Sequence, residues 1–305
     1  MKILLLGKNG QVGWELQRAL APLGTLTALD RQGAGALCGD IADLDRLAAT
    51  VRSLQPQVIV NAAAHTAVDK AESEPELAAR LNAEAPAVLA REAAVLGATL
   101  LHYSTDYVFD GSGSVPWTEN AATGPLSVYG RTKLAGEEAI RQSGCRHLIF
   151  RTSWVYAARG GNFAKTMLRL GSERERLTVI DDQWGAPTGA ELIADVSAHA
   201  LRHLQRHPDD VGTYHLAAGG QTNWHAYAQF VFDTARRLSP QWPLQLKELA
   251  AVPTEAFPLP APRPRNSRLD TRRLESTFGL ILPPWQQGVE RMLSETLSHQ
   301  PLAQS

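Results

Sequence analysis

Short apolar runs separated by amphipathic segments dominate the first half of the chain. Apolar residues at helical spacing follow the first run, as at Val12, Leu16 and Leu20. The apolar runs themselves lie at residues 2–6, 25–29, 58–61, 98–103 and 146–150. Runs of this length are typical of strands that are buried on both faces of a parallel sheet. This alternation predicts an α/β fold with a doubly wound parallel sheet, a Rossmann domain, over residues 1–150.

The pattern is less regular after residue 150. It predicts three helices and two strands, over residues 162–170, 191–203, 285–297, 177–180 and 212–217. Five prolines between Val252 and Pro264 predict an extended loop. We expect residues 151–305 to form mainly a smaller C-terminal substrate-binding region, with some segments returning to the first domain.

Bulk composition narrows the range of partners. The chain has 305 residues, of which 44% are hydrophobic and 20% charged, and its formal net charge is -1. This balance gives no indication of nucleic-acid binding, and no run approaches the roughly 18 apolar residues of a membrane span. Cys38 and Cys145 lie far apart without CxxC spacing, which indicates reduced thiols and a cytoplasmic location. We therefore expect neither a nucleic-acid nor a membrane partner.

The first candidate site follows the first predicted strand. Gly7, Gly10 and Gly13 form a G-x-x-G-x-x-G loop between that strand and an amphipathic helix. Glycines here permit a tight turn and let the backbone approach a pyrophosphate at the positive end of the helix. The spacing therefore indicates dinucleotide binding, and the alternative is a turn that only packs the helix on the strand.

Four polar residues in later loops extend this prediction. Asp30 lies 17 residues after Gly13, close to where a carboxylate meets the ribose 2′-hydroxyl of NADH. Arg31 follows at once and can accommodate the 2′-phosphate of NADPH, so both cofactors stay open. Asp40 can face the adenine or cap the next helix. His65 can contact the cofactor or be an ordinary polar loop residue.

The second candidate site joins a strand end to a later helix. Thr105 ends the fourth predicted strand, and Tyr129 and Lys133 share one face of a helix one turn apart. An ammonium beside a phenol lowers the phenol pKa from its ordinary value of about 10. Together with the Thr105 hydroxyl, this pair can supply a proton to a carbonyl that receives a hydride. A lone Y-x-x-x-K motif is otherwise an exposed helical pair.

Longer segments of the chain resemble one family. These segments cover residues 7–13, 61–69, 104–111, 129–133, 151–156, 182–188 and 262–270. They are similar to the dTDP-4-dehydrorhamnose reductase family of the extended short-chain dehydrogenase/reductase superfamily, over essentially the whole chain. The resemblance implies reduction of the 4-keto group of dTDP-4-dehydro-β-L-rhamnose to dTDP-β-L-rhamnose with NADH or NADPH. It also implies a role in rhamnose-containing cell-surface polysaccharide.

The resemblance also implies residue roles. Tyr129 would donate the proton, Lys133 would hold the nicotinamide ribose and tune Tyr129, and Thr105 would polarise the keto oxygen. Thr105, Asp106 and Trp154 would contact the sugar nucleotide. The cofactor would be lined by residues of the glycine loop and of four strand ends, namely Gly7, Gly10, Gln11, Val12, Gly13, Asp30, Asp40, Ile41, Ala64, His65, Thr66, Tyr103, Tyr129 and Lys133.

A metal site and a homodimer follow from the resemblance alone. Some members of the family form dimers bridged by Mg²⁺ that is held by glutamates. Glu15, Glu191 and Glu295 occupy plausible matching positions. The sequence shows no compact ligand cluster, so surface carboxylates are the alternative.

Arginines in the proline-rich loop add a third candidate. Arg263, Arg265 and Arg268 lie in one basic stretch, where guanidinium groups can bind the diphosphate of a nucleotide sugar. The alternative is a solvated basic loop.

Two other functions compete with reduction. A sugar-nucleotide dehydratase needs a glutamate directly after the aspartate that follows the catalytic threonine, but here Tyr107 follows Asp106. An epimerase is less well excluded by sequence. A non-catalytic dinucleotide-binding regulatory subunit has no chemical need for Thr105, Tyr129 and Lys133 together, which favours the enzyme.

Overall fold

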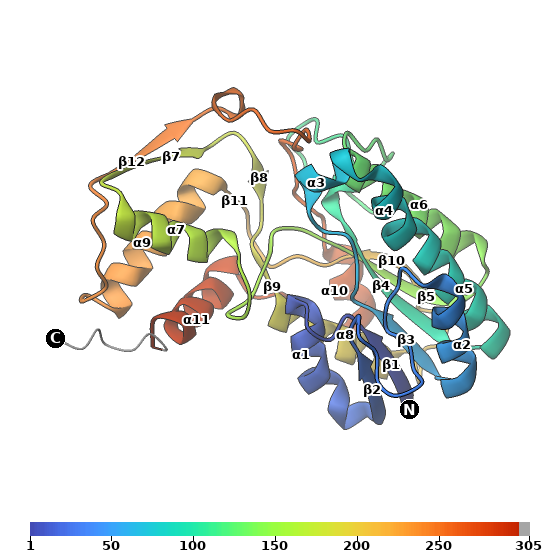
Figure 1. The fold of residues 1–305 in the computed structure, drawn as a ribbon. Helices are drawn as coiled ribbons and strands as arrows, with labels where there is room; N and C mark the ends of the chain where they lie inside the picture. The colour runs from blue at the N-terminus through green and yellow to red at the C-terminus, as the bar shows by residue number, and fades with distance from the viewer. Residues whose placement is uncertain (299–305) are drawn as a thin grey trace.

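A parallel sheet with helices on both faces forms the larger lobe of the computed structural model, which describes residues 1–298 (Figure 1). The strand order is β10-β5-β4-β3-β1-β2, and every neighbouring pair is parallel. The strands are β1 (Lys2–Leu6), β2 (Thr25–Leu29), β3 (Val58–Asn61), β4 (Thr99–Thr105), β5 (Arg146–Thr152) and β10 (Gly212–His215). The predicted doubly wound sheet is confirmed. Its winding direction reverses between β1 and β3, where open α/β sheets bind ligands.

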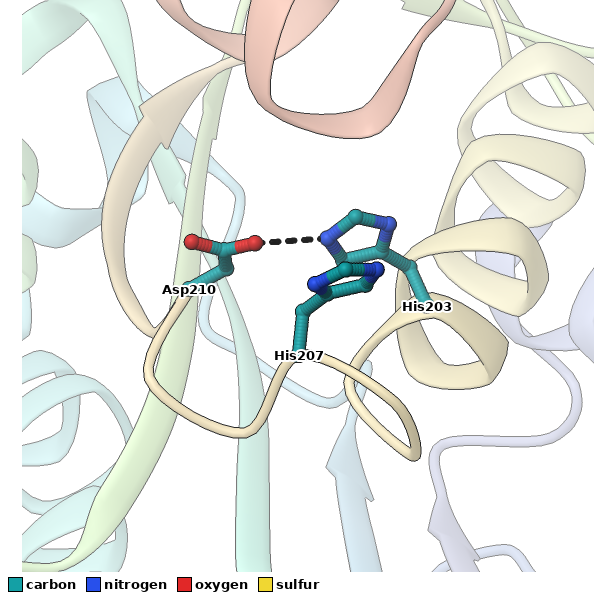
Figure 2. A group of neighbouring side chains, drawn as sticks. All are labelled: His203, His207 and Asp210. Atoms are coloured by element: carbon teal, nitrogen blue, oxygen red, sulfur yellow. Dashed lines mark hydrogen bonds and ion pairs between the residues drawn. The ribbon is translucent and has the colours of Figure 1, made fainter.

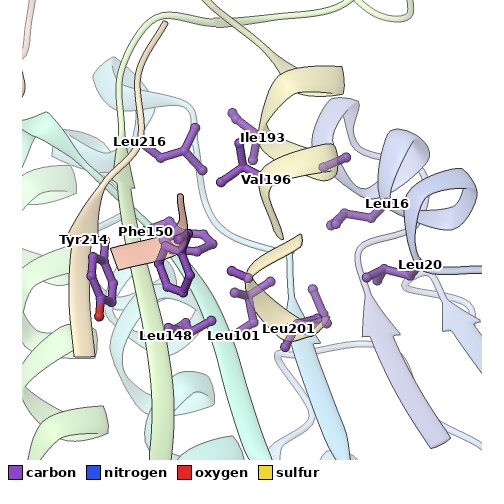
Figure 3. Close-up of a cluster of buried hydrophobic side chains, with 14 of the residues drawn as sticks. Leu16, Leu20, Leu101, Leu148, Phe150, Ile193, Val196, Leu201, Tyr214 and Leu216 are labelled. Atoms are coloured by element: carbon purple, nitrogen blue, oxygen red, sulfur yellow. The ribbon is translucent and has the colours of Figure 1, made fainter. Parts of the chain in front are cut away.

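Alternate side chains of each strand pack against opposite helix layers. In β1, Ile3 and Leu5 belong to one apolar cluster, whereas Leu4 and Leu6 belong to the other. Figure 3 shows the first cluster, in which Phe150 of β5 lies near Leu148, Leu101 and Tyr214 of the sheet, while Leu16 and Leu20 belong to a covering helix. Because both faces are covered, these strands consist of continuous apolar runs.

The helices of the first layer come from distant parts of the chain. They are α1 (Gln11–Leu20), α8 (Ala190–His203) and α10 (Arg272–Phe278), and α1 packs closely along α8. The second layer contains α2 (Leu44–Leu54), α5 (Ala85–Leu96) and α6 (Val128–Gln142). Thus α8, β10 and α10 return from the second half of the chain to the larger lobe.

The smaller lobe has its own apolar core (Figure 1). Its helices are α7 (Phe163–Glu173), α9 (Trp224–Leu238) and α11 (Trp285–Ser298), and its parallel strand pair is β7 (Arg176–Ile180) with β12 (Glu248–Val252). Short strand pairs connect the lobes, namely β6 (Val155–Tyr156) with β9 (Thr188–Gly189), and β8 (Trp184–Gly185) with β11 (Thr222–Asn223). Sequence analysis assigned neither α9 nor β12.

The chain between β3 and β4 forms several consecutive helical pieces. The segment contains α3 (Val68–Ser73), α4 (Pro75–Ala79) and a π-helical turn, η2 (Arg80–Glu84), before α5 begins. Pro86 has no N–H group and cannot bond the carbonyl of Asn82, so the regular i→i−4 pattern fails there. No helix within residues 1–298 is long and apolar enough to cross a membrane.

Candidate functional site

A cavity of about 680 Å³ lies at the carboxyl ends of β1, β3 and β4. This volume is within the usual range for a small-molecule site. The cavity brings together twelve of the residues expected to line a cofactor, namely Gly7, Gly10, Gln11, Val12, Asp30, Asp40, Ile41, Ala64, Thr66, Tyr103, Tyr129 and Lys133. Residues from separate strand ends therefore surround one space, as the parallel sheet requires.

The glycine loop leaves backbone groups free at the start of α1. Gly7 has a φ of 85°, and a Cβ atom there would come within 2.8 Å of the backbone at Ala62. Gly10 caps α1 without a side-chain hydrogen bond. The first N–H groups of the helix thus have no side-chain partner at the cap, and they suit an anion such as a pyrophosphate.

Two of the expected cofactor residues do not line this cavity. A Cβ atom on Gly13 would collide with the carbonyl oxygen of Gly7, so Gly13 lets α1 pack tightly on the loop. His65 is buried, its backbone N–H donates to Asn82 Oδ1 at 2.8 Å, and its Nε2 atom lies 3.5 Å from Glu74 Oε2. Neither residue lines the cavity, so a contact of either one with the cofactor stays a prediction.

Opposite charges meet where the adenosine ribose was expected. Asp30 accepts a hydrogen bond from Asn9 Nδ2 at 3.0 Å, and Lys8 Nζ lies 3.3 Å from the same carboxylate oxygen. The neighbouring Arg31 is 86% exposed in its side chain, and its Nε atom lies 3.3 Å from Asp40 Oδ2. The site therefore offers both a carboxylate for a ribose hydroxyl and an exposed guanidinium for a phosphate.

Helix α6 presents three ionisable residues on one face. Ser127 begins the helix by accepting a hydrogen bond from the N–H of Gly130, and Tyr129, Lys133 and Glu137 follow at i, i+4 and i+8. Glu137 is fully buried and accepts two hydrogen bonds from Arg151, at 2.9 and 2.7 Å. The ion pair of Glu137 with Arg151 therefore holds α6 in place one turn after Lys133.

Thr105 connects Tyr129 to Asp106. The Thr105 hydroxyl donates to Asp106 Oδ1 at 3.0 Å, accepts from the N–H of Tyr107 at 3.2 Å, and also forms a hydrogen bond with the Tyr129 hydroxyl. Burial raises the pKa of Asp106 to about 6, although hydrogen bonds from Ser267 and Thr105 oppose the rise. The proton on Thr105 thus points at Asp106, and it must turn toward a substrate oxygen before Thr105 can polarise it.

The structure corrects one electrostatic expectation. Burial raises the pKa of Tyr129 to about 12, opposed by its hydrogen bond with Thr105. Lys133 does not counter this effect, because its Nζ atom donates to the carbonyl oxygen of Tyr103 at 2.6 Å instead. Burial also lowers the pKa of Lys133 to about 8, with the charge of Glu137 acting in the opposite direction. Tyr129 is therefore a protonated donor in this state.

His102 contacts the other side of Lys133, and its protonation can be assigned from its partners. Burial and the nearby charge of Lys133 lower the pKa of His102 well below its ordinary value, so the ring is neutral. Asn61 Oδ1 accepts from the N–H of Ala63 at 3.2 Å, which turns Asn61 Nδ2 toward His102 Nδ1, also at 3.2 Å. Nδ1 is then the acceptor and Nε2 carries the proton.

Trp154 lies outside the cavity, at the junction of the two lobes. Its φ is 48°, a strained value for a non-glycine residue, and its ring stacks on Trp224 with centroids 3.6 Å apart. A Cβ atom on Gly185 would come within 2.7 Å of the Trp154 ring. Thr105 and Asp106 are likewise absent from the lining of the cavity. The three expected substrate residues thus do not line the cavity, although Thr105 contacts Tyr129, which does.

The basic stretch is largely ion-paired. Arg263 Nη2 lies 2.6 Å from Asp69 Oδ2, and Arg265 pairs with Glu255. Arg268 Nε donates to Asn266 Oδ1 at 2.8 Å. The Nη1 atom of Arg263 is buried without a hydrogen-bond partner, so this guanidinium keeps one donor available for a ligand.

Comparisons with known proteins identify the family. A family model described as the RmlD substrate binding domain matches residues 1–298. A dTDP-4-dehydrorhamnose reductase of Escherichia coli is 59% identical over 295 residues, which is 97% of this chain and 98% of that protein. One from Burkholderia thailandensis is 45% identical and covers 98% of this chain and 100% of its own. The chain belongs to the dTDP-4-dehydrorhamnose reductase family.

Solved structures of the dTDP-4-dehydrorhamnose reductase family have the same fold. One from Clostridium acetobutylicum has a TM-score of 0.86 at 36% identity and covers 96% of this chain and 98% of its own. One from Bacillus anthracis, in complex with NADP, has a TM-score of 0.85 at 33% identity and covers 97% of this chain and 100% of its own. These comparisons confirm the predicted family and the prediction that the chain is a reductase.

The glutamates expected to bind Mg²⁺ in the dTDP-4-dehydrorhamnose reductase family lie in one region. Burial raises the pKa of Glu191, and the charges of Glu295 and Glu15 add to this effect. Glu15 Oε2 lies 3.5 Å from Arg18 Nε, and Glu295 Oε1 lies 3.4 Å from Arg291 Nε. These three glutamates do not form a compact ligand group, and within residues 1–298 the only such group is His203, His207 and Asp210.

Sequence analysis missed several lining residues of the cavity. Leu77 and Leu81 come from α4 and η2, and their apolar character is indistinguishable from that of core residues in the sequence. Asn9 and Ser104 lie inside the glycine loop and the segment 104–111, but neither was predicted to line the cofactor site. His102 lies within the β4 run, and only the fold reveals its contact with Lys133.

Proposed function

We propose that this protein reduces the 4-keto group of dTDP-4-dehydro-β-L-rhamnose to dTDP-β-L-rhamnose, with NADPH or NADH as the reductant. The observation that carries the proposal is the hydrogen-bonded chain from Tyr129 through Thr105 to Asp106 beside a cavity that begins at the glycine loop. Membership of the family and the likeness to an NADP-bound relative support it.

The residues present fit a nicotinamide dinucleotide. Gly7 and Gly10 line the cavity, and the N–H groups at the start of α1, which no side chain caps, suit a diphosphate. Asp30 and Arg31 would bind the adenosine ribose, and Lys133 the nicotinamide ribose. When bound, the reduced cofactor supplies the hydride.

The proton would come from Tyr129. With a pKa raised to about 12, Tyr129 keeps its proton at neutral pH until negative charge develops on the keto oxygen. Thr105 would turn its hydroxyl from Asp106 Oδ1 to that oxygen, while Asp106 and Trp154 hold the sugar nucleotide. Lys133 would then stabilise the tyrosinate that remains after proton transfer.

Further predictions rest on the resemblance alone. They comprise a product used for cell-surface polysaccharide and a homodimer with Mg²⁺ at Glu15, Glu191 and Glu295. A cytoplasmic location is also predicted, from the two separate cysteines. Sedimentation of the protein in Mg²⁺ and in EDTA tests the homodimer with Mg²⁺. A dimer that forms equally in both solutions would contradict a bridging role for the ion.

The decisive experiment follows oxidation of NADPH and of NADH at their absorbance band, with dTDP-4-dehydrorhamnose supplied in situ by the upstream enzymes. We expect stoichiometric turnover to dTDP-rhamnose, and turnover slower by about 10²-fold or more with Tyr129→Phe. A chain that binds the cofactor tightly without turnover would instead be a regulatory subunit. Epimerisation without net oxidation of the cofactor would indicate the epimerase alternative.

A further inference from the structure

His203, His207 and Asp210 lie together at the end of α8, away from the cavity (Figure 2). The N–H of His207 donates to the carbonyl oxygen of His203 at 3.1 Å, which continues the helical turn and stacks the two rings with centroids 4.4 Å apart. The N–H of Asp210 donates to the carbonyl oxygen of His207 at 3.3 Å, which turns the chain back toward the helix. Backbone bonds thus hold all three residues in place.

The side chains converge on one point. His203 Nε2 lies 2.6 Å from Asp210 Oδ2, and one ligand atom from each of the three residues lies within 4.8 Å of the others. In a tetrahedral zinc site, ligand atoms are separated by roughly 3.4 Å, given metal–ligand distances of about 2.0–2.2 Å. Small side-chain rotations would therefore convert the present arrangement into a ligand set. His207 is exposed and can make such a rotation without disturbing the core.

Surrounding contacts orient two of the ligands. The His203 ring packs edge-on against Phe278 with centroids 5.2 Å apart, and Tyr214 donates its hydroxyl proton to the carbonyl oxygen of Asp210 at 3.0 Å. His199, one turn earlier in α8, has its Nε2 atom 2.8 Å from the carbonyl oxygen of Phe278, so this nitrogen is occupied. Within residues 1–298 the convergent set is therefore restricted to three residues.

We propose that His203, His207 and Asp210 form a binding site for a divalent transition-metal ion of the Zn²⁺ class. Two imidazoles and one carboxylate suit Zn²⁺, Ni²⁺ or Cu²⁺, whereas Mg²⁺ prefers oxygen ligands. The bound ion would fix the end of α8 to the turn that precedes β10. The cluster lies at the amino end of β10, whereas the cavity lies at the carboxyl ends of the parallel strands. The ion would therefore stabilise the fold without entering the proposed reaction.

The test is calorimetric titration of the EDTA-treated, dialysed full-length protein with Zn²⁺ alone, and separately with Mg²⁺. We expect one Zn²⁺ per chain and at least tenfold weaker binding in His207→Ala. This variant keeps the hydrogen bond between His203 and Asp210, so its melting temperature without metal should match that of the wild type. Asp210→Asn should also weaken binding, and Asp209→Asn, which changes the adjacent exposed carboxylate, is the matched control.

Further readouts separate the site from general metal binding. Zn²⁺ should raise the melting temperature of the wild type and of Asp209→Asn, but not of His207→Ala, because only a native-state ligand stabilises the fold. Oxidation of NADPH by His207→Ala should equal that of the wild type. Equal Zn²⁺ affinity in wild type and His207→Ala, or tighter binding of Mg²⁺ than of Zn²⁺, would overturn the proposal.

Discussion

The Nε2 atom of His102 lies 3.3 Å from the Nζ atom of Lys133. Because the hydrogen bond with Asn61 makes Nδ1 the acceptor, the ring directs an N–H group at the lysine. An N–H donor favours the neutral amine, whereas the carbonyl oxygen of Tyr103 and the charge of Glu137 favour the ammonium. Lys133 thus lies between groups that prefer opposite protonation states, which suits a residue that must respond to charge on Tyr129.

Replacement of His102 should move the alkaline limb of the pH profile. In the wild type, kcat/KM should fall above a pH of about 8, where Lys133 loses its proton and no longer supports charge on Tyr129. His102→Leu removes the N–H donor, so the pKa of Lys133 should rise and the limb should shift by about one pH unit upward. His102→Gln can keep a donor toward Lys133 and should restore the original limb.

A magnetic resonance measurement tests the same arrangement without turnover. The ¹⁵N spectrum of histidine-labelled protein should show a neutral His102 ring with its proton on Nε2. A proton on Nδ1 would contradict the assigned contact with Lys133. A pH profile of His102→Leu that coincides with that of the wild type would show that His102 contributes packing alone.

Tyr129→Phe should remove the proton donor and keep the shape of the site. General acid catalysis contributes about 10²- to 10⁴-fold, so kcat should fall by that range. The edge-to-face contact with Tyr107 does not require the hydroxyl, so the fold and the affinity for NADPH should be preserved. Stopped-flow hydride transfer and fluorescence titration of NADPH measure the two effects. A variant with near-normal kcat would exclude Tyr129 as the donor.

Thr105 provides a test of the hydroxyl itself. Thr105→Val keeps the branched shape but removes the bonds to Asp106 and Tyr129, and we expect a loss of about 10²-fold or more in kcat/KM. Thr105→Ser is the matched control, because it keeps the hydroxyl, and it should retain most of the activity. If both variants lose activity equally, the methyl group and not the hydroxyl determines the rate.

The sequence predicted what depends on local pattern. The β1 run, the glycine loop and the helical spacing of Tyr129 and Lys133 are each visible within a few residues, and the structure contains all three elements. The contact between His102 and Lys133 joins β4 to α6, and such pairs depend on the packing of separate elements. The pKa of Tyr129 was misjudged for the same reason, because its direction depends on burial and on the carbonyl that engages Lys133.

Asp106→Asn should stabilise the protein at neutral pH. The folded-state pKa of about 6 exceeds the ordinary value of 3.8, so the folded state binds the proton more tightly than the unfolded state. The unfolding free energy should therefore fall as the pH rises from about 4 to about 6, by at most about 3 kcal/mol. Asparagine has no charge to bury, so the variant should lack this fall.

Urea unfolding at pH 4.5 and 7.5 measures the difference. Asp110→Asn is the matched control, because hydrogen bonding to Ser112 lowers the pKa of that exposed carboxyl and its loss should not stabilise the fold. Equal stability of the wild type and Asp106→Asn at pH 7.5 would mean that the folded protein solvates the carboxylate well. A stabilised but inactive variant would show that Asp106 is retained for substrate at the expense of stability.

Arg31 and Asp30 should determine the choice between NADPH and NADH. Arg31 has an 86% exposed side chain near Asp40, so it can move to a 2′-phosphate, whereas Asp30 is held by Lys8 and Asn9 where it can accept from a 2′-hydroxyl. Arg31→Ala should raise KM for NADPH about tenfold and change KM for NADH little. Asp30→Asn should do the reverse, because a neutral side chain repels the phosphate less and binds the diol more weakly. Steady-state kinetics with both cofactors measures the ratio. If Arg31→Ala changes the KM values for NADPH and NADH equally, the guanidinium supports the loop and does not bind the 2′-phosphate. Lys8 would then be the next residue to replace.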